Sequence, residues 1–204
     1  MVEAPCEAPH RYKRVRVRAN WSWKELDCSC SSDALLMNIF CYPALTDLPS
    51  VCALLGSDVA ELPEFGFKPR TPLLKLRLDN TEIDMRLGGL LVEAKLTESG
   101  FQLADPRLVL RYRDLATVFD IEELPLWDGK HIGYQLIRGA LAAYACKASF
   151  CVFCDSIEGW YRVIRAVRLS DLRCRLKLLT WQELAAAVPI ELQDFLASKY
   201  GIVP

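Results

Sequence analysis

The sequence predicts an α/β fold in which a mixed central sheet carries helices on both faces. Two observations support this fold class. Residues 81–96 have the pattern of a β-hairpin with a two-residue Gly88-Gly89 turn. After the hairpin, helical and strand patterns alternate, with a helix over 132–147, a strand over 149–155, a helix to about 168 and a strand over 173–178. Strands that alternate with helices after an antiparallel hairpin favour a mixed sheet.

Length and composition fit one domain over residues 1–204. The chain is 52% hydrophobic and 25% charged, and its net charge of −1 gives no global basic field that would indicate a nucleic-acid partner. The first fourteen residues contain no apolar run typical of a secretory signal, and no stretch is long and apolar enough to span a bilayer. We therefore expect a cytoplasmic protein with no membrane partner, and nine cysteines that are reduced thiols.

The N-terminal third contains a basic strand pattern, one helix and a long loop. Arginines alternate with small apolar residues over 14–19, which is typical of an edge strand with solvated arginines; a phosphate-contacting ribbon is the alternative. Ser31 or Ser32 can cap a helix that ends near Cys41, before Pro43. Its buried side is expected to contain Leu35, Leu36, Ile39 and Phe40. Residues 46–72 are rich in Pro and Gly and indicate a loop, with a short helix near 51–55.

The remaining elements follow from periodicity and capping signals. Residues 73–78 are a strand candidate before the hairpin, and 108–112 are another within the irregular, acidic segment 97–129. The helix over 132–147 is apolar nearly all round, which predicts burial, and the strand over 149–155 suits the centre of a sheet. Asp155 with Glu158, and Thr180 with Glu183, form capping boxes for two further helices. Residues 173–178 alternate like a strand, and a last helix over 190–200 ends at Gly201.

The hairpin holds the most informative charges in the chain. Its two-residue turn sets Leu87 opposite Leu90, Met85 opposite Val92 and Ile83 opposite Ala94, so that one side is apolar. On the other side Asp84 falls opposite Glu93, and Glu82 falls opposite Lys95. Opposed like charges are destabilising because their Cβ atoms are only about 5 Å apart. A divalent cation between the two carboxylates removes this repulsion. The alternative is a surface ribbon with a Glu82–Lys95 salt bridge and a tolerated Asp84–Glu93 clash.

Two carboxylates and a lysine on one face of a ribbon suit phosphodiester hydrolysis. Asp84 and Glu93 would hold Mg²⁺, or alternatively Mn²⁺, with the Ala94 carbonyl as a further oxygen ligand. The metal would polarise a phosphate oxygen and lower the pKa of a bound water. Lys95 would stabilise the developing negative charge or orient the attacking water.

Asp84, eight intervening residues and then Glu93-Ala94-Lys95, on a hairpin followed by a helix and a strand, resemble the PD-(D/E)XK nuclease superfamily. The resemblance covers a restriction endonuclease-like core of about residues 31–179, flanked by a basic N-terminal extension and C-terminal helices. It implies that the matching acids bind Mg²⁺ and that the lysine is catalytic. It also implies an additional acid from an earlier helix or loop, for which Glu61 and Glu64 are the candidates. Ile83 stands where the superfamily has its proline.

The helix after the hairpin supplies further candidates. RecB-like members of the superfamily carry a glutamine on this helix, which Gln135 resembles, and this implies a catalytic role for Gln135. The tyrosine expected four positions later is Gly139 in this chain. Arg138 shares one side of the helix with Gln135 and is a candidate for contacting substrate.

Basic and cysteine-rich patterns each allow two interpretations. Arg162, Arg165 and Arg168 form a stripe that, with Arg173, Arg175 and Lys177, would track a phosphate backbone or form an ordinary solvated face. Cys28-x-Cys30 and Cys151-x-x-Cys154 could ligate zinc or an iron–sulfur cluster, but buried structural thiols are favoured. Only two histidines are present, which argues against a His-rich zinc site.

These patterns together predict a Mg²⁺-dependent nuclease that acts on DNA, and they leave RNA open. The alternative is a nucleic-acid-binding or assembly protein that keeps the fold without turnover. A homodimer is compatible with the sequence.

Overall fold

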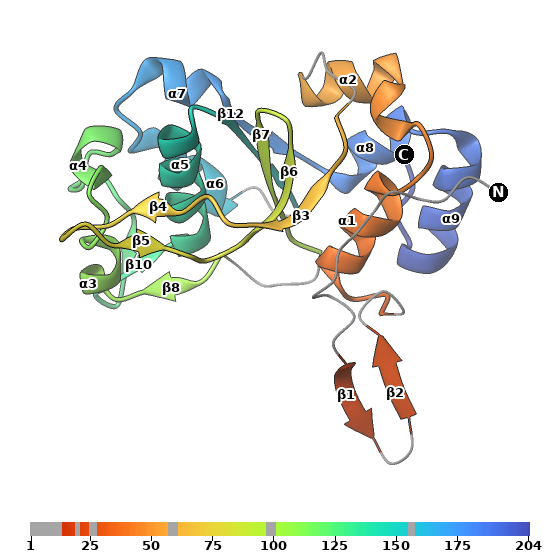
Figure 1. Cartoon of the computed structure of the whole chain (residues 1–204), viewed down its shortest axis with the longest axis horizontal. Coiled ribbons are helices and arrows are strands. Elements are labelled where there is room, and N and C mark those ends of the chain that lie inside the picture. The colour runs from red at the N-terminus through yellow and green to blue at the C-terminus, as the bar shows by residue number, and fades with distance from the viewer. Residues whose placement is uncertain (1–13, 19–20, 25–27, 57–60, 97–100, 155–157) are drawn as a thin grey trace.

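A five-stranded mixed sheet forms the centre of the molecule (Figure 1). The computed structural model describes residues 14–18, 21–24, 28–56, 61–96, 101–154 and 158–204, and for 14–18, 21–24, 158 and 159 it describes the backbone only. The strand order is β12-β11-β7-β6-β3. The strands are β3 (Glu64–Phe67), β6 (Ile83–Leu87), β7 (Leu90–Ala94), β11 (Ser149–Phe153) and β12 (Leu176–Leu179). β3, β6 and β7 pair antiparallel, whereas β11 runs parallel to both β7 and β12, so the predicted mixed sheet is confirmed.

Helices cover both faces of this sheet, as predicted (Figure 1). One face carries α5 (Tyr134–Cys146) and α6 (Glu158–Arg165). The other carries α1 (Ser32–Phe40), α2 (Pro49–Leu55), α8 (Trp181–Ala187) and α9 (Ile190–Tyr200). Successive side chains of a strand point to opposite faces, so Phe150 and Val152 of β11 belong to the α5 core, and Cys151 and Phe153 belong to the other.

Several helices begin and end where their sequence signals predict. The Ser31 side chain accepts a hydrogen bond from the Ala34 amide and caps α1. The Thr180–Glu183 capping box is formed at the start of α8, and α9 ends at Gly201 with φ 70°. Asp155 and the side chain of Glu158 lie outside the described residues, so the other predicted box stays a prediction.

Three strand predictions were wrong in detail. Residues 73–78 are not one strand, because the chain reverses at Lys75 and Leu76 between β4 (Thr71–Pro72) and β5 (Leu78–Asp79). Residues 108–112 contain the end of α3 (Pro106–Val109) and an isolated bridge from Tyr112 to Leu73. Residues 173–178 begin in α7 (Ser170–Cys174), and β12 starts only at Leu176. In addition, β3 lies within 46–72, which the sequence pattern assigned to a loop.

Smaller elements complete the described chain. They are the 3₁₀ helix η2 (Leu45–Asp47), α4 (Leu115–Val118), and a three-stranded sheet of β8 (Leu103–Ala104), β10 (Lys130–Ile132) and β9 (Leu126–Trp127). A hairpin of β1 (Arg14–Arg18) and β2 (Trp21–Lys24) projects from the rest of the chain (Figure 1) and confirms the N-terminal strand. Its side chains lie outside the described part, so their role stays a prediction. No helix in the described residues has the length and apolar character needed to cross a membrane.

Candidate active site

The hairpin of β6 and β7 has the predicted register. Met85 pairs with Val92, and Leu87 pairs with Leu90. Gly88, the first turn residue, has φ 55°, as a type II′ turn requires. Every residue of β7 is buried, because α5 covers the face that carries Glu93, whose exposed fraction is 1%. The alternative of a solvated surface ribbon is therefore wrong.

Asp84 lies where the backbone pairing of β6 with β7 ends. Continuing the register by one pair sets it opposite Glu93, and its Oδ2 accepts a hydrogen bond of 2.8 Å from the Ala94 amide. Burial raises the pKa of Asp84 well above its usual value, and the negative charge of Glu93 raises it further. The two carboxylates are thus neighbours, as the sequence predicted, and the structure adds that they lie in a poorly solvated place.

Three side chains approach the Glu93 carboxylate. Gln135 Nε2 donates to Oε1 at 2.8 Å, and Lys95 Nζ lies 3.3 Å from the same oxygen. Arg138 Nη2 lies 3.7 Å from Oε2. Burial raises the pKa of Glu93, and the positive charges of Lys95 and Arg138 partly oppose this rise. Among the described residues Oε2 has no hydrogen-bond partner although it is buried, which is unusual for a carboxylate oxygen and fits a metal ligand.

Lys95 is held by its own backbone. Its amide donates to the Phe153 carbonyl at 2.7 Å, and its carbonyl accepts from Trp181 Nε1 at 2.7 Å. The side chain then turns toward Glu93 instead of Glu82, so the Glu82–Lys95 salt bridge of the surface alternative is not formed. Glu82 pairs with Lys68 at 3.5 Å. The lysine is therefore fixed beside the carboxylate pair.

A third acid, Asp33, acts on this pair and was missed by the sequence analysis. It lies in the first turn of α1, and its negative charge raises the pKa of both Asp84 and Glu93. One feature of the sequence could have indicated Asp33: it is the only acid between residues 31 and 41, on a helix that precedes the hairpin. The superfamily resemblance implies an acid from such an element.

The sequence suggested Glu61 and Glu64 as the additional acid of the site, but neither lies beside Asp84 and Glu93. Glu61 lies with its carboxylate against Gly88, at the turn end of the hairpin. Glu64 is exposed on β3, opposite Arg86 and two residues nearer the turn than Asp84. The strand β6 separates Glu64 from Glu93 on β7. Asp33 is thus the described acid that accompanies Asp84 and Glu93.

A family model described as "Restriction Endonuclease associating with ARP" matches residues 2–201. The chain belongs to this restriction endonuclease family. No curated protein and no solved structure matches the chain. The match includes the hairpin and all five strands of the central sheet, and the mixed sheet with helices on both faces is that of a restriction endonuclease-like fold. The description of the family suggests a nuclease, and this agrees with the carboxylates of Asp84 and Glu93 and with Lys95, the residue after β7.

In this restriction endonuclease-family chain, α5 brings Gln135 and Arg138 to the same side, as predicted. The helix starts after Gly133, whose φ of 75° turns the chain into it. The amides of Gly133 and Tyr134 donate to the Gln102 carbonyl, and the amide of Gln135 donates to the Phe101 carbonyl. These bonds fix the first turn, so that Gln135 faces β7.

A buried polar cluster lies beside this first turn. Tyr112 donates a hydrogen bond to Asp79 Oδ2, and its hydroxyl lies 3.2 Å from the hydroxyl of Tyr134. Arg111 Nη2 lies 3.3 Å from both Asp79 Oδ2 and the Tyr134 hydroxyl. Hydrogen bonds from Thr81 and Tyr112 lower the pKa of Asp79 against the effect of burial. The cluster therefore links Asp79, at the end of β5, to Tyr134, the residue that precedes Gln135 on α5.

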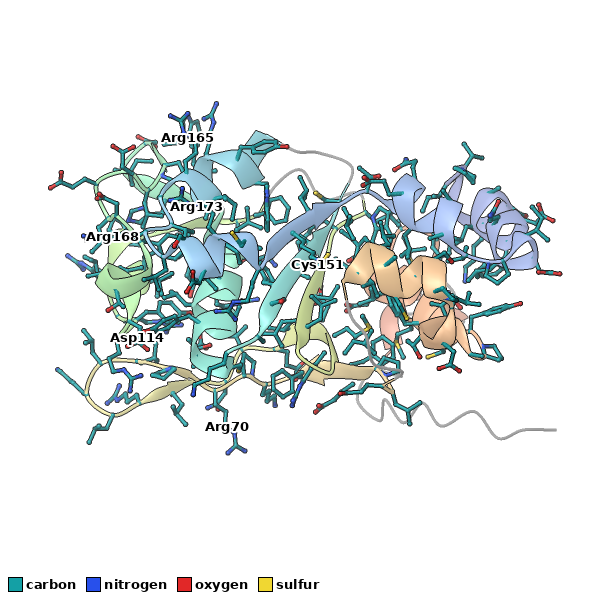
Figure 2. The ribbon with its side chains drawn as sticks, turned by 90° about the horizontal axis from the view of Figure 1, so that it is seen from above. Arg70, Asp114, Cys151, Arg165, Arg168 and Arg173 are labelled. Carbon is teal, nitrogen blue, oxygen red and sulfur yellow. The ribbon has the colours of Figure 1, made fainter. Side chains whose placement is uncertain are left out.

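The basic cluster predicted near the C-terminus divides into two groups. Arg173, Arg175 and Lys177 donate to backbone carbonyls, namely those of Val167, Ala148 and Leu55. They therefore support the fold. The stripe of Arg162, Arg165 and Arg168 is exposed along and just after α6, and Figure 2 shows Arg165 and Arg168 at the same end of the molecule. No described ion pair or hydrogen bond links this stripe to Glu93.

The cysteines considered as metal ligands occupy separate places. Cys151 and Cys154 are buried, but in the cores on opposite faces of the sheet, and Figure 2 shows Cys151 in the interior. Burial raises the pKa of the Cys151 thiol, which disfavours the thiolate needed for metal binding. Cys28 is half-buried and Cys30 is exposed. Within the described ranges, no three His, Cys, Asp or Glu residues lie close enough together to form a metal-binding group.

Proposed function

We propose that the protein is a Mg²⁺-dependent nuclease that hydrolyses phosphodiester bonds in DNA. One observation carries the proposal: two opposed carboxylates, one of them with a buried oxygen that has no hydrogen-bond partner among the described residues, lie beside a lysine fixed at 3.3 Å. Membership of a restriction endonuclease family supports the nuclease class and favours DNA over RNA.

The residues present fit a divalent cation. Asp84 and Glu93 would hold it, with the Ala94 carbonyl as a further oxygen ligand, while Asp33 adds negative charge from outside the ligand set. When bound, Mg²⁺ or Mn²⁺ supplies polarisation of the phosphate and eases deprotonation of the attacking water. The raised pKa values of Asp84 and Glu93 mean that protons compete for the same oxygens, so cation affinity is expected to rise with pH.

The neighbouring side chains have separate roles in this proposal. Lys95 Nζ places positive charge where negative charge develops on the phosphate, or orients the attacking water. Gln135 fixes the Glu93 carboxylate through Oε1 and leaves Oε2 available. Arg138 holds the Glu82 carbonyl at 3.3 Å and directs positive charge toward Glu93, from where it can contact the substrate. Arg162, Arg165 and Arg168 offer exposed cations for the DNA backbone outside the site.

The test is cleavage of supercoiled plasmid and linear DNA in the presence of Mg²⁺ or Mn²⁺. We expect cleavage by the wild type and a loss of about a hundredfold or more in Lys95→Ala, because one stabilising positive charge is removed. Lys147→Asn is the matched control, since Lys147 is exposed at the C-terminal end of α5 and has φ 53°, which Asn tolerates. It should cleave like the wild type.

Equal cleavage by wild type and Lys95→Ala, at equal melting temperature, would contradict the proposal. Salt-dependent DNA binding without cleavage under any metal condition would instead assign the protein as a nucleic-acid-binding or assembly protein on the same fold.

A further inference from the structure

A narrow arm of residues 68–79, the β4–β5 arm, projects from the sheet (Figure 1). It leaves the end of β3, reverses at Lys75 and Leu76, and returns to β6 at Ile83. The two tip residues have φ 58° and 56°, a left-handed conformation that Gly and Asn adopt far more readily than Lys and Leu. The tip therefore carries a long cation and a large apolar side chain where the backbone would favour small residues.

The tip exposes apolar side chains. Leu76 is fully exposed, and the exposed fractions of Leu74 and Leu78 are 52% and 48%. The same residues line one side of an open hollow that Arg113 closes on the other side. These leucines do not pack in either core. Exposed apolar side chains at a projecting tip indicate contact with another molecule.

The charge of the arm is strongly one-sided. Residues 68–79 contain four basic residues and one acid, Asp79, which is buried. Lys68 pairs with Glu82, whereas Arg70, Lys75 and Arg77 have no ion-pair partner among the described residues. Arg70 points away from the body of the molecule at the base of the arm (Figure 2). This charge complements a polyanion.

The arm is fixed along its length, and its end lies beside the first turn of α5. The Leu74 amide donates to the Arg111 carbonyl at 2.8 Å, and the Arg113 amide donates to the Pro72 carbonyl at 3.2 Å. Asp79, at the end of the arm, belongs to the cluster with Tyr112 and Tyr134. From Leu76 to Asp84 the chain spans at most about 29 Å. The tip therefore lies no farther from Asp84 than about eight or nine base pairs of duplex DNA.

We propose that the β4–β5 arm lies in a groove of duplex DNA beside the scissile phosphate. Arg70, Lys75 and Arg77 contact backbone phosphates, and Leu76 packs against the edges or steps of the base pairs. A two-stranded ribbon fits the major groove, and apolar side chains flanked by cations are used as wedges in the minor groove. This inference rests on the proposed nuclease function and names the element that would hold its substrate.

The decisive variant replaces Lys75 with Asn and Leu76 with Gly. Asn-Gly is the pair that this turn conformation prefers, so K75N/L76G should fold at least as stably as the wild type while losing one cation and the apolar tip. Lys147→Asn is again the control, because it makes the same charge change at a positive φ at the far end of α5.

Binding is measured by fluorescence anisotropy in EDTA, with a labelled duplex of about 30 base pairs and a single strand of equal length, at several salt concentrations. For K75N/L76G we expect duplex affinity to fall by about tenfold or more and the salt slope to fall by about one, with a smaller loss on the single strand. The melting temperature should not fall. Lys147→Asn should bind like the wild type.

Unchanged duplex affinity in K75N/L76G would overturn the inference and assign the exposed leucines to a protein partner. An equal loss on duplex and single strand would also overturn the groove placement. In both cases Mg²⁺-dependent cleavage of the same duplex by the wild type would leave the proposed function standing. A wild type that neither binds nor cleaves DNA would contradict both the proposed function and the inference about the β4–β5 arm.

Discussion

At the scale of single residues, the candidate site places stability and function in opposition. Asp84 and Glu93 are acids whose pKa values are raised in the folded chain, mainly by burial. An acid whose folded pKa lies above its unfolded pKa gives stability that is present at low pH and lost as pH rises. At neutral pH without metal, both carboxylates therefore reduce the stability of the fold that positions them.

Asp84→Asn should accordingly melt at a higher temperature than the wild type at pH 8 in EDTA. Asn keeps an oxygen that accepts the Ala94 amide but removes the charge facing Glu93. The gain should be a few degrees, since about 1 kcal/mol shifts a chain of this size by about 2–4 °C. Differential scanning fluorimetry measures it.

The same experiment contains its own control. Adding Mg²⁺ should raise the melting temperature of the wild type but not of Asp84→Asn, because only the wild type keeps both proposed ligands. A variant that melts lower than the wild type in EDTA would show that Asp84 stabilises the fold.

How far the site could be predicted from sequence also depends on single residues. Asp84, Glu93 and Lys95 were found because the turn at Gly88 fixes their register locally. Asp33 was not found, because an acid in the first turn of a helix is normally explained by the helix dipole. Its approach to the hairpin depends on how α1 packs on the sheet, which no local pattern records.

At the scale of elements, the hairpin, the capped helices and the central strand were predicted, and the β4–β5 arm was not. The alternation of Leu with Lys and Arg over 73–78 is the pattern of a continuous strand. The chain nevertheless reverses at two residues that give no turn signal. β3 was not predicted for a related reason, because Gly66 interrupts its four residues and weakens the strand pattern.

The contact between α5 and β11 gives a prediction for Gly139. A Cβ at this position would collide with the ring of Phe150 on β11. We expect Gly139→Ala to lower the free energy of unfolding by about 1–3 kcal/mol, because the helix must move away from the sheet. Urea denaturation measures this change.

Cleavage by Gly139→Ala should also fall, since moving α5 draws Gln135 from Glu93. The comparison is Gly89→Ala, at a glycine with no atom within 4 Å of the added Cβ. Equal stability of the two alanine variants would mean that α5 and β11 do not depend on this close approach.

At the scale of the whole molecule, one sheet separates two cores, and the site lies where strands β6 and β7 meet helices from both layers. Asp33 comes from the α1 side, and Gln135 and Arg138 come from the α5 side. Hydropathy predicted both layers correctly. It could not predict their relative placement, which brings residues far apart in the sequence to the same carboxylates.

At this scale His131 should lower the stability of the chain as the medium becomes acidic, which is opposite in sign to the effect of Asp84 and Glu93. This histidine is buried on β10, and burial lowers its pKa, partly opposed by a hydrogen bond to the Pro125 carbonyl. A histidine with a folded pKa below its unfolded pKa of about 6.5 gives stability that is full above that pH and is lost below it.

Urea unfolding at pH values from about 7.5 to 5 tests this expectation. Relative to His131→Gln, the wild type should lose stability as the pH falls over this range, and the difference between the two curves isolates the histidine from Asp84, Glu93 and other titrating groups. Parallel curves would show that His131 is not the source of the pH dependence.

The start of α5 bears on which parts of such an enzyme would bind the substrate and which would carry out the reaction. Its first amides already bond to the Phe101 and Gln102 carbonyls, so a phosphate at the site cannot draw on the end of this helix. The described charged side chains that act on the site are three acids, Asp33, Asp84 and Glu93, and two bases, Lys95 and Arg138. If the proposed function holds, such a centre would hydrolyse DNA but would bind it weakly. Most of the binding affinity would then come from surfaces outside the centre, so substitutions there could change which substrate is bound without changing the proposed catalytic residues.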